Sequence, residues 1–314
     1  MRWLTDAPER TTAFLPAGQG WHLLSRPGDA AEPAFWPGLA GARPAWSAAG
    51  HEATTTPYPD RPWVIIDEAE RSQFTVLLEA LKAGAVLPDG LACIALTGKQ
   101  FHGQRQRAWS ALRGNLHLTV YYRLSVDAGQ AQAGLAMAPA VAVIHALERM
   151  SEGRLQPAIK WTNDILLYGK KVAGVLTSTL LEGAQIQHVL FGVGLNIDVA
   201  PALAPSAMTP PPGALADFDP ALRGALPRLF PAVVDAMDEA VACVREGHSA
   251  QLFESYRTRA AFLGREVSIW AAAETDGPPA TPLARGRVVE LRPDLSLIIT
   301  GCPEPVTTGR MVLE

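Results

Sequence analysis

The sequence predicts an α+β fold in which a mixed, largely antiparallel sheet packs against helices, followed by a small β domain at the C-terminal end. The first observation is a series of four apolar runs between residues 159 and 197, separated by short turns as in an antiparallel meander. The second is helical periodicity before and after these runs. The third is a change near residue 263 to short apolar runs between turn formers, typical of a small five-stranded barrel.

Apolar runs from Pro62 onward predict the first part of this fold. Three have the length and composition of strands: 63–66, 91–96 and 115–124. Two have helical spacing: 74–83 and 135–150. The second helix should start near Pro139, because proline suits the first turn of a helix.

The remaining runs complete the sheet and supply the small domain. The meander strands are expected at 159–161, 165–167, 172–181 and 186–197. Two amphipathic helices, 226–245 and 252–262, should close over the sheet. The C-terminal strands are expected at 266–270, 286–291, 295–300 and 310–313. Residues 1–61 have no assigned role, and the Pro- and Ala-rich stretch 198–220 predicts a surface excursion.

Composition limits the classes of function. The 314 residues carry a formal net charge of -4, which argues against binding nucleic acid or an anionic membrane through overall charge. Three widely spaced cysteines, with no Cys-x-x-Cys pair, disfavour a disulfide scaffold and fit the reducing cytoplasm. Charged residues within the first ten positions argue against a signal peptide. The most apolar run, 134–147, is too short for a membrane span.

Other common catalytic motifs are missing from the sequence. There is no His-x-x-x-His pair, no Gly-x-Ser-x-Gly elbow and no Walker-type phosphate loop. Metalloprotease and hydrolase functions therefore lack support.

The first candidate site is the loop 97–109, with sequence TGKQFHGQRQRAW. It places Lys99, Arg105 and Arg107 at the end of a predicted strand, where cationic side chains can fold over a phosphate and stabilise charge during its transfer. The alternative is a solvated basic loop without a ligand.

Two further segments carry candidate residues. In 160–174, Lys160 and Lys171 start neighbouring strands around an Asn-Asp turn, so a hairpin would bring both lysines to one site; the alternative is that the turn residues serve conformation alone. In 192–196, Gly-Val-Gly-Leu-Asn lacks the third glycine of a dinucleotide fingerprint, but it allows close approach of a flat ligand and offers Asn196 as an amide contact.

Together these segments resemble biotin protein ligases. The shared features are a basic loop ending in Arg-x-Trp, Gly114-Asn115-Leu116, Lys-Trp-x-Asn-Asp-Ile-Leu with Gly-Lys-Lys-Val-Ala-Gly-Val-Leu, and Gly-Val-Gly-Leu-Asn-Ile, in this order. The resemblance implies a class II synthetase-like biotin/lipoate ligase catalytic domain at 62–262 and an SH3-like domain at 263–314. Residues 1–61 are an N-terminal extension of unknown role, without a recognition-helix pattern, so a ligase without DNA binding is expected.

The resemblance also implies an activity. Members of this family convert ATP and biotin, with Mg²⁺, to biotinyl-5'-AMP and pyrophosphate, and then transfer biotin to a lysine of a biotin carboxyl carrier protein domain. It assigns Lys171 to the carboxylate and α-phosphate, and Arg105 and Arg107 to the loop that closes over the adenylate. The implied substrate and ATP contacts are Gly103, Gln104, Trp109, Gly114, Asn115, Lys160, Asn163, Asp164, Gly174 and Asn196, with Asp164 also the candidate for Mg²⁺. A homodimer is a further expectation.

The sequence departs from the family pattern in the loop. Phe101, His102 and Gln104 replace a glycine and two arginines of the usual Gly-Arg-Gly-Arg-x-Gly-Arg. Gly98 stands where a glutamine commonly contacts biotin, and Ser72-Gln73 is only a loose counterpart of the Ser-Thr-Asn motif. Two alternatives therefore stay open: a ligase for lipoate or a medium-chain acyl group, and a protein that binds biotin or its adenylate without turnover.

Overall fold

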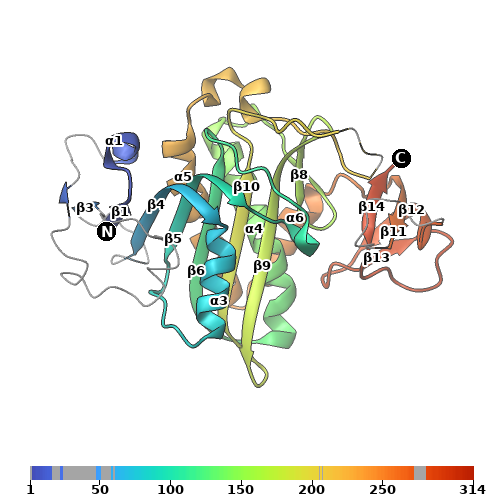
Figure 1. Cartoon of the computed structure of the whole chain (residues 1–314). Helices are drawn as coiled ribbons and strands as arrows, with labels where there is room; N and C mark the ends of the chain where they lie inside the picture. The colour runs from blue at the N-terminus through green and yellow to red at the C-terminus, as the bar shows by residue number, and fades with distance from the viewer. Residues whose placement is uncertain are drawn as a thin grey trace.

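A computed structural model of the chain describes residues 2–15, 22–23, 47–50, 58, 61–204, 206, 208–271 and 281–314. Within these residues, ten strands form one mixed sheet in the order β2-β3-β1-β4-β5-β6-β10-β9-β8-β7 (Figure 1). The strands are β1 Arg2–Thr5, β2 His22–Leu23, β3 Ser47–Gly50, β4 Pro62–Arg71, β5 Ala92–Gln100, β6 Leu116–Asp127, β7 Ala158–Lys160, β8 Asp164–Leu167, β9 Lys170–Glu182 and β10 Gln185–Leu195. The predicted α+β class is confirmed.

The predicted meander is present as β7, β8, β9 and β10, each antiparallel to the next. Tyr168 and Gly169 form the β8–β9 turn with φ angles of 49° and 79°, a backbone conformation that favours glycine. In the register of β9 and β10, Gly174 lies opposite Gly194. This pair of glycines leaves one part of the sheet without side chains.

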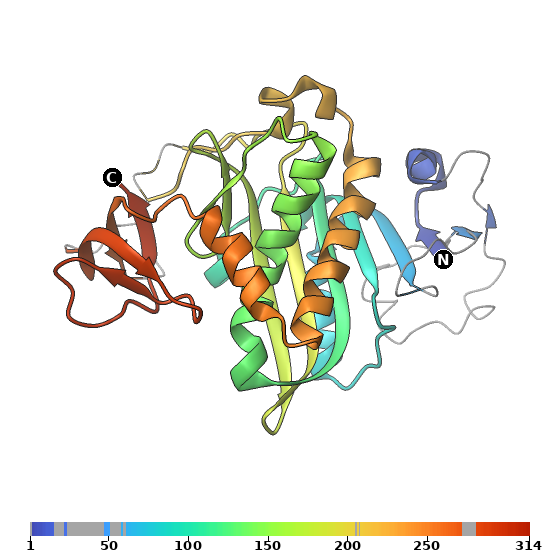
Figure 2. The ribbon, with the colours of Figure 1, turned by 180° about the vertical axis from the view of Figure 1, so that it is seen from behind.

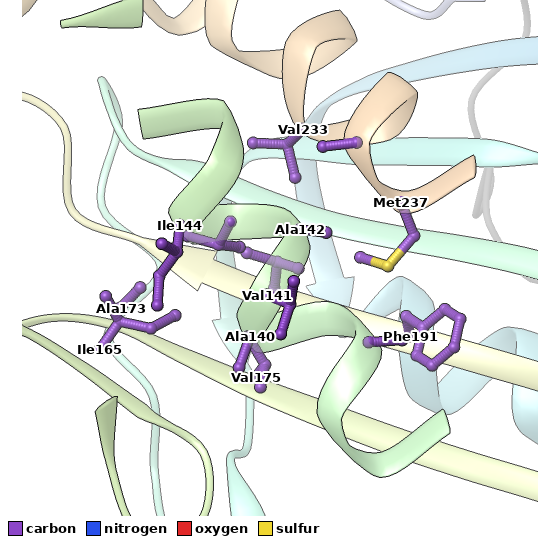
Figure 3. Packing of buried hydrophobic residues seen from close by; sticks show 14 of the residues in the cluster. Ala140, Val141, Ala142, Ile144, Ile165, Ala173, Val175, Phe191, Val233 and Met237 are labelled. Atoms are coloured by element: carbon purple, nitrogen blue, oxygen red, sulfur yellow. The ribbon is translucent and has the colours of Figure 1, made fainter. Parts of the chain in front are cut away.

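Helices cover both faces of the sheet, as Figures 1 and 2 show together. One face carries α3, Gln73–Lys82, and the other carries α4 Ala128–Met150, α5 Leu226–Arg245 and α6 Ser249–Thr258. Figure 3 shows small residues of α4 packed between the sheet and α5, with Val141 near Val175 and with Met237 near Phe191. Burial of each such aliphatic side chain stabilises the fold by about 1.5–3 kcal/mol.

The prediction of where α4 starts was wrong. The helix begins at Ala128, where the Asp127 side chain accepts a 3.1 Å hydrogen bond from the Gln130 amide, and Pro139 lies inside it. Proline has no amide hydrogen for the carbonyl four residues earlier, Leu135, and Thr177 Oγ1 donates to that carbonyl instead at 3.3 Å. A bond from β9 therefore replaces a bond within the helix, which periodicity alone does not indicate.

By length and apolar composition, α4 alone among the described helices could cross a membrane. However, 72% of its most apolar window is buried inside the protein. It packs between the sheet, α5 and α6, and so belongs to the hydrophobic core.

The C-terminal residues form a second, smaller sheet. Its order is β13-β12-β11-β14, from strands β11 Glu266–Trp270, β12 Ala284–Leu291, β13 Leu297–Ile299 and β14 Arg310–Leu313. The described residues show four strands and an isolated bridge between Leu297 and Val306, where the sequence predicted five strands. The two parts of the chain are joined by a 2.8 Å hydrogen bond from the Trp161 indole to the Leu295 carbonyl.

The described part of residues 1–61 belongs to the main sheet. Strand β1 pairs in parallel with β4 and antiparallel with β3. Arg10 forms a 2.5 Å ion pair with Asp67, and the Phe14 ring meets the Phe230 ring edge-on at 6.3 Å between centroids. The rest of this stretch lies outside the described residues, and its role stays unassigned.

Candidate functional site

A solvent-open cavity of about 900 Å³, which we call the open cavity, lies above the β8–β9 hairpin and the end of β10. Its walls come from the loop 103–110, from the sheet and from the stretch 201–212. Of the residues that the sequence assigned to a site, those lining it are Gly103, Gln104, Arg107, Trp109, Asn163, Lys171, Gly174 and Asn196. The structure therefore brings together parts of all three candidate segments.

An ion-paired cluster forms the base of this site. Lys171 Nζ lies 2.6 Å from Asp164 Oδ1, and Lys160 Nζ lies 3.7 Å from Asp164 Oδ2. The register explains the cluster, because Asp164 on β8 lies opposite Lys160 on β7, and Lys171 starts the adjacent strand β9. Lys160 and Asp164 are buried, whereas Lys171 is partly exposed and lines the open cavity.

The charges of the cluster shift each other's protonation. Burial raises the pKa of Asp164, but the two lysines outweigh burial and hold its pKa below the ordinary value. Burial lowers the pKa of Lys160 to about 8, a shift that Asp164 opposes and that Lys171, Arg310 and Arg107 reinforce. Lys171 and Arg107 line the open cavity, and Lys160 and Arg310 lie close enough to interact electrostatically with this cluster. Four cations near one carboxylate make an environment suited to a polyanion.

Trp109 lies over this cluster. The centre of its ring is 5.7 Å from Lys171 Nζ. A Cβ atom at Gly194 would lie 2.3 Å from Trp109 Cζ2, and one at Gly174 would lie 3.2 Å from Lys171 Nζ. The two glycines are therefore needed because an indole and an ammonium group occupy the space where side chains would stand.

The basic loop is a closed hairpin. Gly103 N donates to Arg107 O at 2.7 Å, and Trp109 N donates to Phe101 O at 2.8 Å. The tip is a short 3-10 turn, Gln104–Gln106, in which Arg105 and Gln106 have φ angles near 57°. Arg107 lines the open cavity, whereas Arg105 is exposed at the tip and is not among the lining residues.

Asn163 and Asn196 line the open cavity, and each amide also holds the backbone around it. Asn163 Nδ2 donates to Val175 O at 2.8 Å, and Asn196 Nδ2 donates to Gly213 O at 3.0 Å. The stretch 198–220 is thus tied down rather than a free surface excursion. Lys171 N donates to Pro211 O at 2.8 Å, and the apolar Leu215 is fully buried.

Gly114 and Asn115 do not line the open cavity, but they contact the backbone and side chains that follow Asn196. Asn115 Oδ1 accepts from Ile197 N at 2.9 Å and from Asp198 N at 3.1 Å. Gly114 has a φ of 90°, and a Cβ there would contact the Asp198 side chain at 3.0 Å. These residues fix the backbone that follows Asn196.

A second cavity, which we call the aromatic cavity, lies on the other side of Trp109. It has a volume of about 350 Å³ and is lined by Ser72, Gln73, Phe74, Phe101, His102, Trp109, His117, Leu118, Thr119, Leu176, Gly192, Val193 and Gly194. Trp109 is shared by both cavities. The sequence analysis missed Phe74 and His117 as lining residues.

His117 fixes the indole that separates the two cavities. Trp109 Nε1 donates to His117 Nδ1 at 3.3 Å, so the His117 proton is on Nε2, 3.1 Å from the Leu112 carbonyl. Burial lowers the pKa of His117 to about 4. The alternation of 115–124 separated His117, Thr119 and Tyr121 from an apolar face, yet the structure buries them too, because α3 covers their side of the sheet.

The C-terminal sheet also reaches this site. Arg310 on β14 donates a hydrogen bond to the hydroxyl of Thr209, a residue that lines the open cavity. No local motif marks Arg310, so only the folded chain reveals its position.

This mixed sheet, with a cationic cavity and an aromatic cavity on either side of one tryptophan, has the fold of the biotin protein ligases. The structure is similar to the biotin protein ligase from Aquifex aeolicus in complex with biotin and ATP, with a TM-score of 0.57, 20% identity, and coverage of 80% of this chain and 98% of that chain. It is equally similar to a biotin protein ligase-like protein of unknown function from Silicibacter, with a TM-score of 0.56, 15% identity, and coverage of 81% and 96%.

Residues 75–196 match the model of the Biotin/lipoate A/B protein ligase family. The biotin--[acetyl-CoA-carboxylase] ligase of Paracoccus denitrificans is 37% identical over 136 residues, which are 42% of this chain and 56% of that protein. The bifunctional ligase/repressor BirA of Bacillus subtilis is 31% identical over 115 residues, 36% of this chain and 34% of that protein. The matches thus span between a third and somewhat over half of these two relatives' length.

Proposed function

We propose that the protein is an ATP-dependent ligase that activates biotin as biotinyl-5'-AMP and transfers it to a lysine of a biotin carboxyl carrier protein domain. The observation that carries this proposal is the position of Lys171. Its ammonium group is held by Asp164 at 2.6 Å, under Trp109, where the open cavity and the aromatic cavity meet. An acid whose apolar end lies in the aromatic cavity would present its carboxylate near a nucleotide in the open cavity.

In the first step, a carboxylate oxygen of the acid attacks the α-phosphorus of ATP, and the bond from that phosphorus to the pyrophosphate oxygen breaks. Negative charge develops on the phosphoryl oxygens, and Lys171 and Arg107 are the cations placed to stabilise it. Asp164 holds Lys171 in position before the substrates arrive, so little reorganisation is needed at the moment of reaction.

In the second step, the neutral amine of the carrier lysine attacks the acyl carbon of the adenylate. An amide bond forms, the bond from the acyl carbon to the AMP oxygen breaks, and the amine loses a proton to solvent. In this arrangement the acid occupies the aromatic cavity, so the carrier lysine would arrive through the open cavity.

Mg²⁺ would enter this reaction bound to the phosphates of ATP. The described residues contain no cluster of three metal-ligating side chains. Asp164 would have to give up its ion pair with Lys171 to bind this ion, because its carboxylate is buried between two lysines and is not among the lining residues of the open cavity. Mg²⁺ in nucleotide sites commonly takes one or two carboxylates together with phosphate oxygens. Its chemical contribution would be to neutralise phosphate charge.

One observation favours a second candidate, a ligase for lipoate or a medium-chain acyl group. Gly98 leaves no amide where the family commonly has a glutamine, and the cavity wall there is the Phe101 ring. A wall of this kind offers an aliphatic chain apolar contact without requiring a hydrogen bond from it.

We further propose a cytoplasmic protein, since Cys93, Cys243 and Cys302 are all free thiols and suit a reducing compartment. Division of the chain at residues 62 and 263, homodimer formation and the absence of nucleic-acid and membrane partners stay predictions.

The test is pyrophosphate release from ATP and Mg²⁺ in the presence of biotin, lipoate or octanoate, followed by labelling of a purified carrier domain. Release with biotin and formation of a biotinyl-lysine amide are the expected results. Release with lipoate or octanoate alone would select the second candidate. Tight binding of biotin without release would replace the enzyme by a binding protein.

A further inference from the structure

Phe101 occupies the end of the aromatic cavity next to strand β5. The side chain is buried in the cluster beneath α3, and its ring meets the His117 ring edge-on, with 5.8 Å between centroids. Its carbonyl accepts the 2.8 Å hydrogen bond from Trp109 N. Phe101 is therefore fixed from both its ring and its backbone.

Gly98 and Phe101 compete for one space. A Cβ at Gly98 would lie 2.1 Å from Phe101 Cε2, closer than any side-chain atom can approach. The backbone of Gly98 cannot move away easily, because it pairs with Ala69 of β4 and donates to Ala111 O at 3.2 Å. A side chain at position 98 and the ring at position 101 thus exclude each other.

This exclusion explains two departures from the family pattern as one change. Where biotin ligases commonly have a glutamine followed three residues later by a glycine, this chain has Gly98 and Phe101. The bulky side chain stands at position 101 in this chain and at position 98 in the family pattern. The hydrogen-bonding amide is replaced by an aromatic ring at the same place in the cavity wall.

Gln73 Oε1 is a buried acceptor in this lining without a hydrogen-bond partner among the described residues, but an oxygen does not supply the N–H donor of the lost amide. Both ring nitrogens of His117 are engaged, with Trp109 and with the Leu112 carbonyl. Gln73 Nε2 donates to the His117 carbonyl. Phe74 and Leu176 complete an apolar wall against Gly192. A bound acid would meet carbon atoms at this end.

We propose that Phe101 is the specificity-determining residue for the acid, with its ring closing the aromatic cavity and selecting by shape and apolar contact. This inference rests on the proposed function, because it takes the aromatic cavity as the site of the acid. A compact ring system gains contact with the Phe101 ring, whereas a slender chain gains less.

The experiment is calorimetric titration of biotin, lipoate and octanoate into the full-length protein without ATP, so that binding is measured independently of turnover. The variants are Phe101→Ala, which opens the cavity, and Phe101→Leu, which keeps most of its volume. Phe253→Ala, on α6 and outside both cavities, is the matched control for loss of a partly buried phenylalanine. Thermal unfolding establishes that each variant is folded.

The ratio of the affinities for biotin and octanoate should fall at least tenfold in Phe101→Ala. The same ratio should change less than threefold in Phe101→Leu and should not change in Phe253→Ala. Gly98→Ala should weaken binding of the acid, because the new Cβ overlaps the Phe101 ring. In the double variant with Phe101→Ala this overlap is removed, so Phe101→Ala should cost less affinity there than it costs in the wild type.

An unchanged preference in folded Phe101→Ala would overturn this inference and leave the proposed function standing. If the wild type binds octanoate or lipoate but does not bind biotin, the biotin assignment is overturned. In that case, a tenfold change in the affinity for the bound acid in Phe101→Ala would still support the role of Phe101. Absence of binding for all three acids would overturn both.

Discussion

The open cavity and the aromatic cavity share Trp109 and Leu176 as walls, yet the other residues of their linings differ. The open cavity sets Arg107, Lys171 and two asparagines among apolar alanine, leucine and proline side chains, and these four polar residues match the biotin ligase pattern in order and spacing. The aromatic cavity is lined by Phe74, Phe101, three glycine or valine residues of β10 and several polar residues. Most departures from the pattern lie in the loop that borders both cavities, because Phe101 and His102 line the aromatic cavity and Gln104 lines the open cavity. The comparison teaches that Lys171 and the two asparagines keep the pattern, while the loop over both cavities is rebuilt.

This division has a physical basis. Lys171 is fixed by its ion pair with Asp164, and a charge-assisted bond of this kind is lost when either partner is replaced. An apolar wall can be rebuilt by moving volume between neighbouring positions, as Gly98 and Phe101 show. The following predictions test the two cavities separately.

The largest expected effect is the loss of the buried charge between the two lysines. Asp164→Asn should lower the free energy of unfolding by about 3–5 kcal/mol, because Lys160 would stay buried without its partner. Chemical denaturation measures this. Glu70→Gln, which breaks an exposed ion pair with Lys99, is the control and should cost less than about 1 kcal/mol. Equal effects of the two variants would contradict a buried cluster.

The stability of the folded protein should depend on pH through His117, which lines the aromatic cavity. Its pKa is about 4 in the folded protein and about 6.5 when unfolded, so between these values the unfolded state takes up the proton. The contribution of His117 to stability is complete above pH 6.5 and should fall by about 3 kcal/mol as the pH drops to 4. Denaturation of wild type and His117→Gln across this range isolates the effect. Parallel curves for the two proteins would show that His117 is not the group responsible.

In the open cavity, Lys171→Ala should reduce pyrophosphate release on the order of 10²-fold, because the proposed function makes Lys171 a cation that stabilises charge on the phosphoryl oxygens. Lys170→Ala is the matched control, since Lys170 is the adjacent lysine and does not line either cavity. Biotin binding without ATP should change much less than turnover. Near-normal release from Lys171→Ala would refute its role.

A smaller effect should come from Lys160. With a pKa of about 8, it loses its charge as the pH rises from 7 to 9, and the KM for ATP should then increase roughly tenfold. Lys160→Gln should show the high KM already at pH 7. Loss of folding would not explain a rise in KM over this range. Lys160 keeps its proton up to about pH 10.5 in the unfolded state but loses it above pH 8 in the folded state, so this group makes the folded state more stable as the pH rises above 8. A flat KM for ATP in the wild type would contradict the assignment.

The residues of the open cavity were predictable because the sequence carries them in local motifs. Lys160, Asp164 and Lys171 lie within twelve residues, and a hairpin alone brings them together. Trp109 and Asn196 follow from the same resemblance. The meander and α5 were likewise predicted from periodicity and turn residues.

The walls of the aromatic cavity were not predictable from local pattern. Burial of His117 depends on α3 covering that face of the sheet, and the position of the Phe101 ring depends on how the loop hairpin closes. The start of α4 was missed because Thr177, far along the chain, compensates for Pro139. Arg310 reaches the site only through the docking of the small sheet against the large one.

Trp109 has a consequence for how the two substrates influence each other. Because one indole is a wall of both cavities and is held by His117, an acid that shifts this ring changes the shape of the nucleotide site. Thermodynamic linkage then requires that the factor by which the acid changes the affinity for ATP equals the factor by which ATP changes the affinity for the acid. A ring shared by two neighbouring cavities is thus a route by which each ligand would act on the binding of the other.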